Sequence, residues 1–177
     1  MSPLTSEEKS WLLRLARHSL EARLTRGPGT AAAPDLSLIP SPLREPAGAF
    51  VTLHKSGELR GCVGQVEPRL PLYRAVMEIA VAAALTDPRF APVRADELAE
   101  LELEISVLSP CRLISPDEIR IGVHGLLITQ GSLRGLLLPQ VAVERRWSAE
   151  RFLEETCRKA GLNPGAWRSA RLEVFEA

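Results

Sequence analysis

The sequence predicts an α+β fold in which helices cover a mainly antiparallel sheet. The clearest strand lies over residues 101–107, where apolar and polar side chains alternate. One face of such a strand packs against the core and the other faces solvent or another polar group, which is typical of antiparallel sheets. Two β-hairpin patterns add further strands, and two amphipathic helical patterns supply a cover for the apolar face.

Composition limits the classes of function. The 177 residues fit one domain, or one domain with a smaller lobe, and the 22 basic and 22 acidic residues cancel. No global field therefore draws the chain to nucleic acid or to an anionic membrane. No apolar run approaches the roughly 20 residues that span a bilayer, and the N-terminus lacks a signal-peptide layout. Three cysteines without a C-x-x-C pair argue against a disulfide framework, so we expect a cytoplasmic protein.

A hairpin over residues 51–64 is the centre of the predicted fold. A two-residue loop would mix polar and apolar groups on both faces of the hairpin. A three-residue loop sets His54 opposite Arg60 and Thr52 opposite Cys62, and it leaves the other face uniformly apolar. We prefer the three-residue loop, because a one-residue slip moves every side chain to the wrong face.

The elements before and after this hairpin follow from local signals. A helix is predicted over 5–24, because Thr5 and Glu8 form a capping box ahead of an apolar stripe. Five prolines in residues 26–46 remove any regular period and predict a long surface connection. A helix over 72–85 begins after a proline, and its alanine run makes it thin enough to lie close against a sheet.

The C-terminal part contains a second hairpin over residues 123–138. Gly131 at the first turn position suits a primed turn. A short helix begins at Pro139, a longer one covers 148–160 between a serine N-cap and a terminal glycine, and a last strand covers 170–175. We expect the two hairpins to belong to one sheet that the two longer helices of this main body cover.

Six signatures occur in one order along the chain. They are Leu59-Arg60-Gly61-Cys62-Val63-Gly64, Asp87-Pro88-Arg89-Phe90, Leu103 to Leu108, His124-Gly125-Leu126, Leu136 to Val141 with Glu144 and Trp147, and Phe152-Leu153 with Cys157 to Leu162. Together they resemble the AMME chromosomal region candidate gene product family, whose prokaryotic members are called AmmeMemoRadiSam system protein A. The likeness begins at about Ala49.

The resemblance implies an α+β fold with a larger and a smaller lobe, and an activity that is not established. It also implies association with a Memo-like protein and a radical SAM enzyme. We expect one AMMECR-type domain over residues 1–177. Within it, residues 1–25 form the N-terminal helix, residues 26–46 the Pro-rich connection and residues 47–177 the main body.

Three residues are candidates for catalysis. Cys62 shares a strand face with Arg60 and is predicted to lie near His54, and such neighbours lower the pKa of a thiol and make it nucleophilic. His54 or His124 would then act as the base. The alternatives are a half-buried thiol that only packs, and a histidine at residue 124 that is hydrogen-bonded to backbone at a strand bend.

Glycines in the two hairpins predict a shallow binding cleft if the hairpins adjoin, because a glycine in a strand often marks close approach of a ligand or of another backbone. Candidate binding residues are Arg60, Gly61, Gly64, Gly125, Gln140 and Glu144. The competing account is that the glycines admit the alanine-rich helix, which would seal Cys62. No spacing requires a metal site, and no P-loop or dinucleotide fingerprint predicts a nucleotide cofactor.

Three functions remain open at this stage. The first is an accessory module that binds or presents a small substrate to partner enzymes through Arg60, Gly61 and Cys62. The second is a thiol-dependent enzyme with Cys62 as the nucleophile. The third is a nucleic-acid-binding regulatory protein that uses the arginines, which the neutral charge and the eight aromatic residues disfavour.

Overall fold

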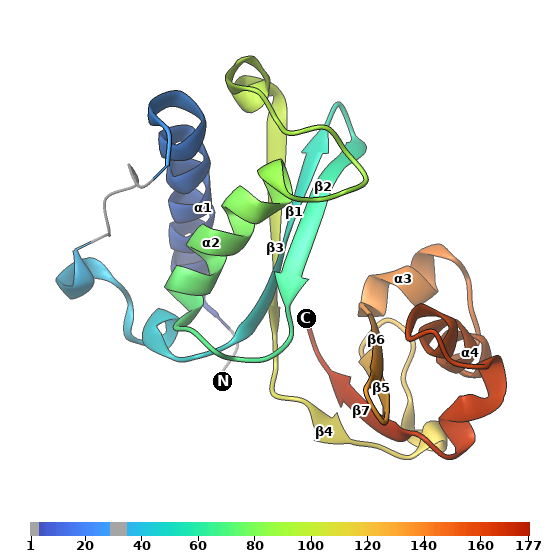
Figure 1. The fold of residues 1–177 in the computed structure, drawn as a ribbon. Coiled ribbons are helices and arrows are strands. Elements are labelled where there is room, and N and C mark those ends of the chain that lie inside the picture. The colour runs from blue at the N-terminus through green and yellow to red at the C-terminus, as the bar shows by residue number, and fades with distance from the viewer. Residues whose placement is uncertain (1–3, 29–34) are drawn as a thin grey trace. The chain divides into compact units, whose positions relative to one another are not determined.

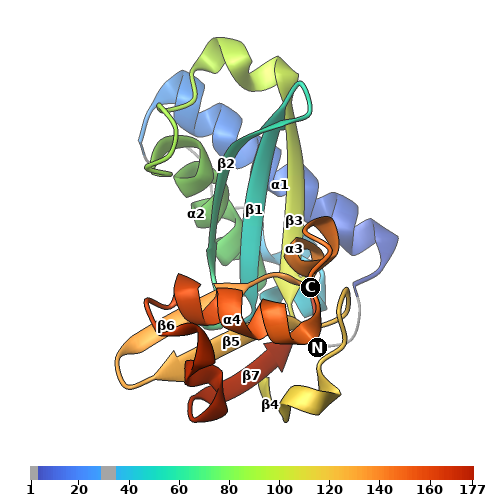
Figure 2. The ribbon, with the colours of Figure 1, turned by 90° about the vertical axis from the view of Figure 1, so that its right-hand side faces the viewer.

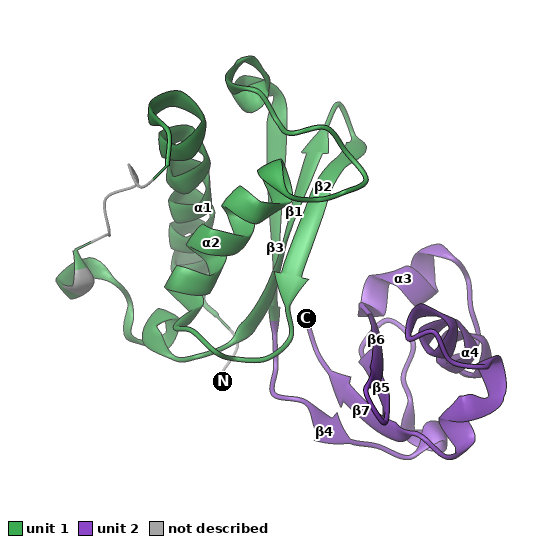
Figure 3. Cartoon of the chain, in the orientation of Figure 1, with its two compact units in different colours: residues 1–107 green, residues 108–177 purple. Residues whose placement is uncertain are grey.

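The computed structural model describes residues 4–28 and 35–177 (Figure 1). The chain forms two compact units, Met1–Val107 and Leu108–Ala177 (Figure 3). This division confirms the larger and the smaller lobe. In the described residues no helix is both long enough and apolar enough to cross a membrane.

The first unit is a three-stranded sheet with two helices on one face. Its elements are α1 (Ser6–Arg26), β1 (Gly48–Lys55), β2 (Glu58–Gln65), α2 (Leu72–Leu85) and β3 (Leu101–Leu108), and the strand order is β2-β1-β3. Helix α2 packs on β1 and β2, and α1 packs on α2 (Figure 1). The core between them includes Val51, Leu53, Val76 and Ala80, all fully buried.

Local signals placed both helices of this unit correctly. The Thr5 side chain accepts the Glu8 N–H and the Glu8 carboxylate accepts the Thr5 N–H, so the predicted capping box is confirmed. Helix α2 has the predicted bounds. Part of the Pro-rich connection lies outside the described residues, but its 3₁₀ turn Ser41–Arg44 buries Leu43 fully in the core.

The predicted hairpin register is half right. Thr52 pairs with Cys62 as expected, but His54 pairs with Leu59 rather than with Arg60. The loop has two residues, and a β-bulge makes Arg60 the extra residue of β2. A two-residue loop with positive φ angles matches the twist of the strands, and the bulge then returns the apolar side chains to one face. The prediction failed because it compared only registers without a bulge.

The β1–β2 turn predicts a stabilising substitution. Ser56 has φ of 54°, in the left-handed region that asparagine tolerates better than serine does. We expect Ser56→Asn to raise the free energy of unfolding by roughly 0.5 kcal/mol in urea denaturation. Ser132 of the other hairpin turn has no positive φ, so Ser132→Asn is the matched control and should give no gain. An equal gain in both variants would contradict the explanation.

The second unit is a four-stranded antiparallel sheet. Its elements are β4 (Arg112–Leu113), β5 (Gly125–Gln130), β6 (Leu133–Leu137), α3 (Pro139–Glu144), α4 (Ala149–Lys159) and β7 (Arg171–Phe175), and the strand order is β4-β7-β5-β6. Helix α4 packs on β5 and β6 (Figure 2), and Phe152, Leu153 and Cys157 bury its apolar face. The Ser148 hydroxyl accepts the Arg151 N–H, as the predicted N-cap requires.

The two hairpins belong to different sheets, so the prediction of one shared sheet is wrong. Strand β1 takes β3 as its second neighbour, while β5 takes β7 from the C-terminal end of the chain. Alternation of side chains shows which residues form strands, but it does not show which strands pair. Each sheet has its own covering helix as a result.

Candidate functional site

The β2 edge at Cys62 is held by a buried carboxylate. Asp87 is 5% exposed, and its Oδ2 accepts the Cys62 N–H at 2.8 Å. Its two oxygens also accept three N–H groups of Arg89: the backbone N at 3.1 Å, Nε at 2.9 Å and Nη2 at 2.7 Å. The Arg89 guanidinium first, and then the Cys62 N–H, hold the pKa of Asp87 well below its usual range. Asp87 is therefore an ionised structural link between β2 and the loop after α2.

The loop position of Asp87 follows from the sequence. Helix α2 ends at Leu85 with Thr86 as its C-cap, and Pro88 disfavours helical geometry at the residue before it. The chain therefore leaves the helix at Asp87, and Arg89 returns to the edge strand, where its Nη2 lies 3.4 Å from the Cys62 carbonyl oxygen. Both backbone polar groups of Cys62 are thus engaged by side chains of one short loop.

The Cys62 sulfur is approached by hydrogen-bond donors. The thiol is half-buried, the Thr52 Oγ1 donates to Sγ at 3.3 Å, and the Arg89 guanidinium also interacts with the side chain. Over residues 4–28 and 35–177, no carboxylate or imidazole makes a hydrogen bond to this sulfur. His54 lies on the same strand as Thr52 but does not bond to Cys62, so it is not placed as a base for the thiol in this structure.

Arg60 forms an internal ion pair. Its Nε and Nη2 each donate to the Glu97 carboxylate at 3.0 Å, and Nη1 donates to the Ala91 carbonyl at 2.8 Å. Arg60 first, together with the Arg94 N–H and Lys55, lowers the pKa of Glu97 to about 2. Glu97 lies 37 residues from Arg60 in the chain, so no local pattern in the sequence identifies it as the partner.

The hairpin glycines make room for protein atoms. A Cβ at Gly61 would lie 2.1 Å from the Ala83 carbonyl oxygen in α2, and one at Gly64 would lie 2.2 Å from the Phe50 ring. A Cβ at Gly125 would lie 2.2 Å from the Phe175 ring. The account in which glycine admits close packing therefore explains these positions, although Cys62 itself stays partly exposed rather than sealed.

His124 ends a tight turn in the second unit. The residue is 1% exposed, its N–H donates to the Arg120 carbonyl at 3.0 Å, and its Nδ1 accepts the Arg120 N–H at 3.2 Å. This is the backbone hydrogen bond that the structural alternative anticipated. Burial first, and then the Arg120 and Arg112 guanidinium groups, lower the pKa of His124. The ring is therefore neutral near pH 7.

The remaining candidates of the second unit lie on α3. Gln140 is half-buried near the start of this helix and Glu144 is exposed at its end. The structure does not test a binding role for either residue, so both stay predictions. In the described part of the chain, no group of three histidine, cysteine or acidic residues is arranged to hold a metal ion.

Known proteins are similar to this chain in sequence and in fold. A family model described as AMMECR1 matches residues 13–177. The chain belongs to the AMMECR1 family. A protein of Methanothermobacter thermautotrophicus is 44% identical, with 98% of this chain and 93% of that protein covered. One of Pyrococcus furiosus is 41% identical, with 99% and 88% covered.

A solved structure has the same fold. The crystal structure of an uncharacterized protein from Pyrococcus horikoshii superposes with a TM-score of 0.90 at 39% identity, and it covers 98% of this chain and 90% of that protein. The family resemblance and the α+β fold are therefore confirmed. The names of these three relatives state no activity.

Sequence reasoning singled out Cys62 but missed the group that fixes it. Asp87 and Arg89 were recognised as part of a family signature, yet their bonds to Cys62 span 25 and 27 residues. Arg112 and Arg120, which flank His124, were not considered. The one available signal was the Asp-Pro step after a helix, which marks a turn but not its partner.

Proposed function

We propose that this chain is an accessory module that presents a ligand to partner enzymes, with the β2 edge around Cys62 as its contact surface. The family resemblance suggests a Memo-like protein and a radical SAM enzyme as the partners. The observation that carries the proposal is that Thr52 and Arg89 contact the Cys62 sulfur, while over residues 4–28 and 35–177 no carboxylate or imidazole bonds to it. A thiol that is activated by a general base needs that base beside it, whereas a presented side chain needs only a fixed position.

The position of Cys62 is fixed on two sides. Asp87 and Arg89 hold its backbone, and the Glu97 carboxylate holds the neighbouring Arg60 with two bonds. Edge strands commonly bind partners by adding a strand through free N–H and C=O groups. Because both groups of Cys62 are engaged, a partner at this point would contact side chains rather than extend the sheet.

One observation favours a thiol-dependent enzyme as the second candidate. The Cys62 thiol is partly exposed and lies beside the Arg89 guanidinium, an environment found around reactive cysteines. The Asp87 carboxylate already neutralises that guanidinium, however, which reduces its effect on the sulfur. A nucleic-acid-binding role has the least support, since basic and acidic residues are equal in number.

Selective capping of thiols tests the proposed contact surface. The Cys111→Ser chain is capped at Cys62 with N-ethylmaleimide and used as bait in extract of its own cells. We expect the Memo-like protein and the radical SAM enzyme to co-purify with the uncapped chain, and the cap to lower their recovery about tenfold. That loss corresponds to roughly 1.4 kcal/mol.

The matched control is the uncapped Cys111→Ser chain, which keeps the Cys62 thiol free and differs from the capped bait only in the cap. It should retain both partners. Undiminished recovery of the partners with Cys62 capped would place the contact surface elsewhere. Absence of both enzymes from the uncapped bait would show that they are not partners of this chain. We also propose a cytoplasmic location, which three free cysteines suit.

A further inference from the structure

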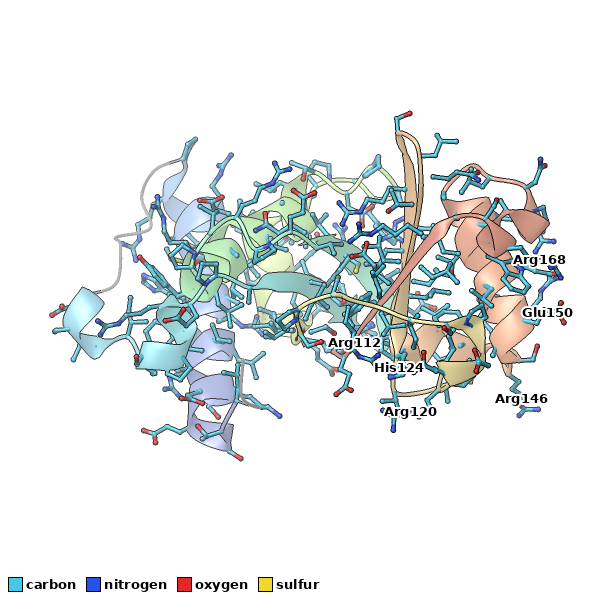
Figure 4. All side chains as sticks on the ribbon, turned by 90° about the horizontal axis from the view of Figure 1, so that it is seen from below. Arg112, Arg120, His124, Arg146, Glu150 and Arg168 are labelled. Carbon is cyan, nitrogen blue, oxygen red and sulfur yellow. The ribbon has the colours of Figure 1, made fainter. Side chains whose placement is uncertain are left out.

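Three hydrogen-bond donors converge in the second unit. Arg112 Nη2 lies 3.3 Å and Arg120 Nη2 3.4 Å from the Nε2 atom of His124 (Figure 4). Because Nδ1 of the ring accepts the Arg120 backbone N–H, a neutral ring carries its proton on Nε2. The Nε2–H and two guanidinium groups therefore meet without an acceptor between them.

No carboxylate neutralises this cluster. Within residues 4–28 and 35–177, neither Arg112 nor Arg120 forms a salt bridge. Glu118 and Glu176 are close enough to influence the His124 ring, but the Glu118 carboxylate accepts the Ser115 N–H and neither acid binds the two guanidinium groups. Buried donors normally have acceptors, so a buried imidazole N–H facing two cations requires an explanation.

We propose that His124, Arg112 and Arg120 form a binding site for a phosphate-class oxyanion. The inference is independent of the function proposed for Cys62. Guanidinium groups bind phosphate through paired hydrogen bonds, and three separate donors suit a tetrahedral anion with three free oxygens better than a carboxylate with two. Both arginine side chains are exposed, so they can move outward to admit an oxygen above the buried ring.

The turn at residues 120–124 presents the site. Reciprocal bonds between Arg120 and His124 close the turn, and Gly122 takes a φ of 83° that allows it. Arg112 comes from β4, which β7 holds in the sheet through the pair Arg112 with Val174. The ring is therefore fixed by backbone, while the two cations come from separate segments of one unit.

Titration with inorganic phosphate tests the site in the full chain. In phosphate-free buffer at constant ionic strength, we expect saturable shifts of the His124 ring signals by NMR, with a pKa that rises when the anion binds. The other two histidines, His18 and His54, serve as internal references. Methyl phosphate should shift the same signals if the natural ligand is a phosphate monoester.

Three variants separate the site from general charge. Arg112→Gln and Arg120→Gln should each weaken phosphate affinity about tenfold or more, because a charge-assisted pair is lost. Arg146→Gln changes an exposed arginine in the turn after α3, in the same unit, and should leave the affinity unchanged. Equal loss in all three variants, no saturable shift of His124, or equal affinity for acetate would each overturn the proposal.

Discussion

Gly61→Ala should lower the free energy of unfolding by about 3 kcal/mol, the upper part of the range for overpacked cores. The added methyl carbon would lie 2.1 Å from the Ala83 carbonyl oxygen, which belongs to the backbone of α2 and cannot rotate away. Either α2 moves off the sheet, which opens gaps against Leu53, or β2 shifts away from β1. Urea unfolding followed by circular dichroism measures the loss.

Gly165→Ala is the matched control for this substitution. A Cβ there would lie 3.2 Å from the Arg168 Nη1 atom, the end of a flexible side chain, so the neighbour can move at little cost. We expect a change within about 0.5 kcal/mol, as for ordinary surface sites. If Gly61→Ala were as stable as this control, α2 would not pack on β2 as closely as described.

Asp87→Ala, a second substitution in the first unit, should lower the free energy of unfolding by about 3 kcal/mol at pH 7. The substitution leaves the Cys62 N–H without its side-chain acceptor and removes the bonds to Arg89. The cost stays below that of a fully buried ion pair, because the Arg89 side chain is 54% exposed and remains hydrated. Denaturant midpoints of the variant and the natural chain give the difference.

A surface pair provides the control for Asp87. Asp96 pairs with Arg94 two residues away, as Asp87 does with Arg89, but the Asp96 side chain is 66% exposed. Asp96→Ala should therefore change the stability by less than about 1 kcal/mol. Comparable losses in both variants would show that burial and the Cys62 bond add nothing to the Asp87 interaction.

The pH dependence of stability follows with a definite sign. The pKa of Asp87 is lower in the folded chain than in the unfolded chain, so folding favours the ionised carboxylate. Its contribution is present above the unfolded pKa of about 4 and is lost as pH falls below it. Glu97, with a folded pKa of about 2, acts in the same direction. Asp87→Asn should therefore reduce, but not abolish, the loss of stability on acidification below pH ~5.

Local elements could be predicted because their signals lie within a few residues. The Thr5–Glu8 box and the Pro71 step marked where α1 and α2 begin, and the Ser148 cap marked α4. Pairing between strands could not be predicted in the same way. The β5–β7 pair joins segments more than 40 residues apart, and a period-2 pattern is the same whichever neighbour a strand takes.

Some residues of the candidate site could be predicted from local sequence signals, and others could not. Cys62 was identified because glycines and an arginine surround it in the sequence. Asp87 was not assigned to it, because a side-chain bond to an edge strand leaves no periodic signal. The His124 cluster was missed for a related reason: Arg112 and Arg120 belong to short segments with no regular pattern, and only the fold of the second unit brings them to one ring.

The alkylation rate of Cys62 tests the central claim most directly, namely that this thiol is presented rather than activated. Cys157 is buried, so in the Cys111→Ser chain iodoacetamide reports on Cys62 alone. We expect a second-order rate at pH 7 no higher than that of a free thiol such as glutathione, because Asp87 neutralises the neighbouring Arg89 guanidinium and no carboxylate or imidazole of the described residues bonds to the sulfur. A rate well above that of the free thiol would contradict the account and establish Cys62 as an activated nucleophile.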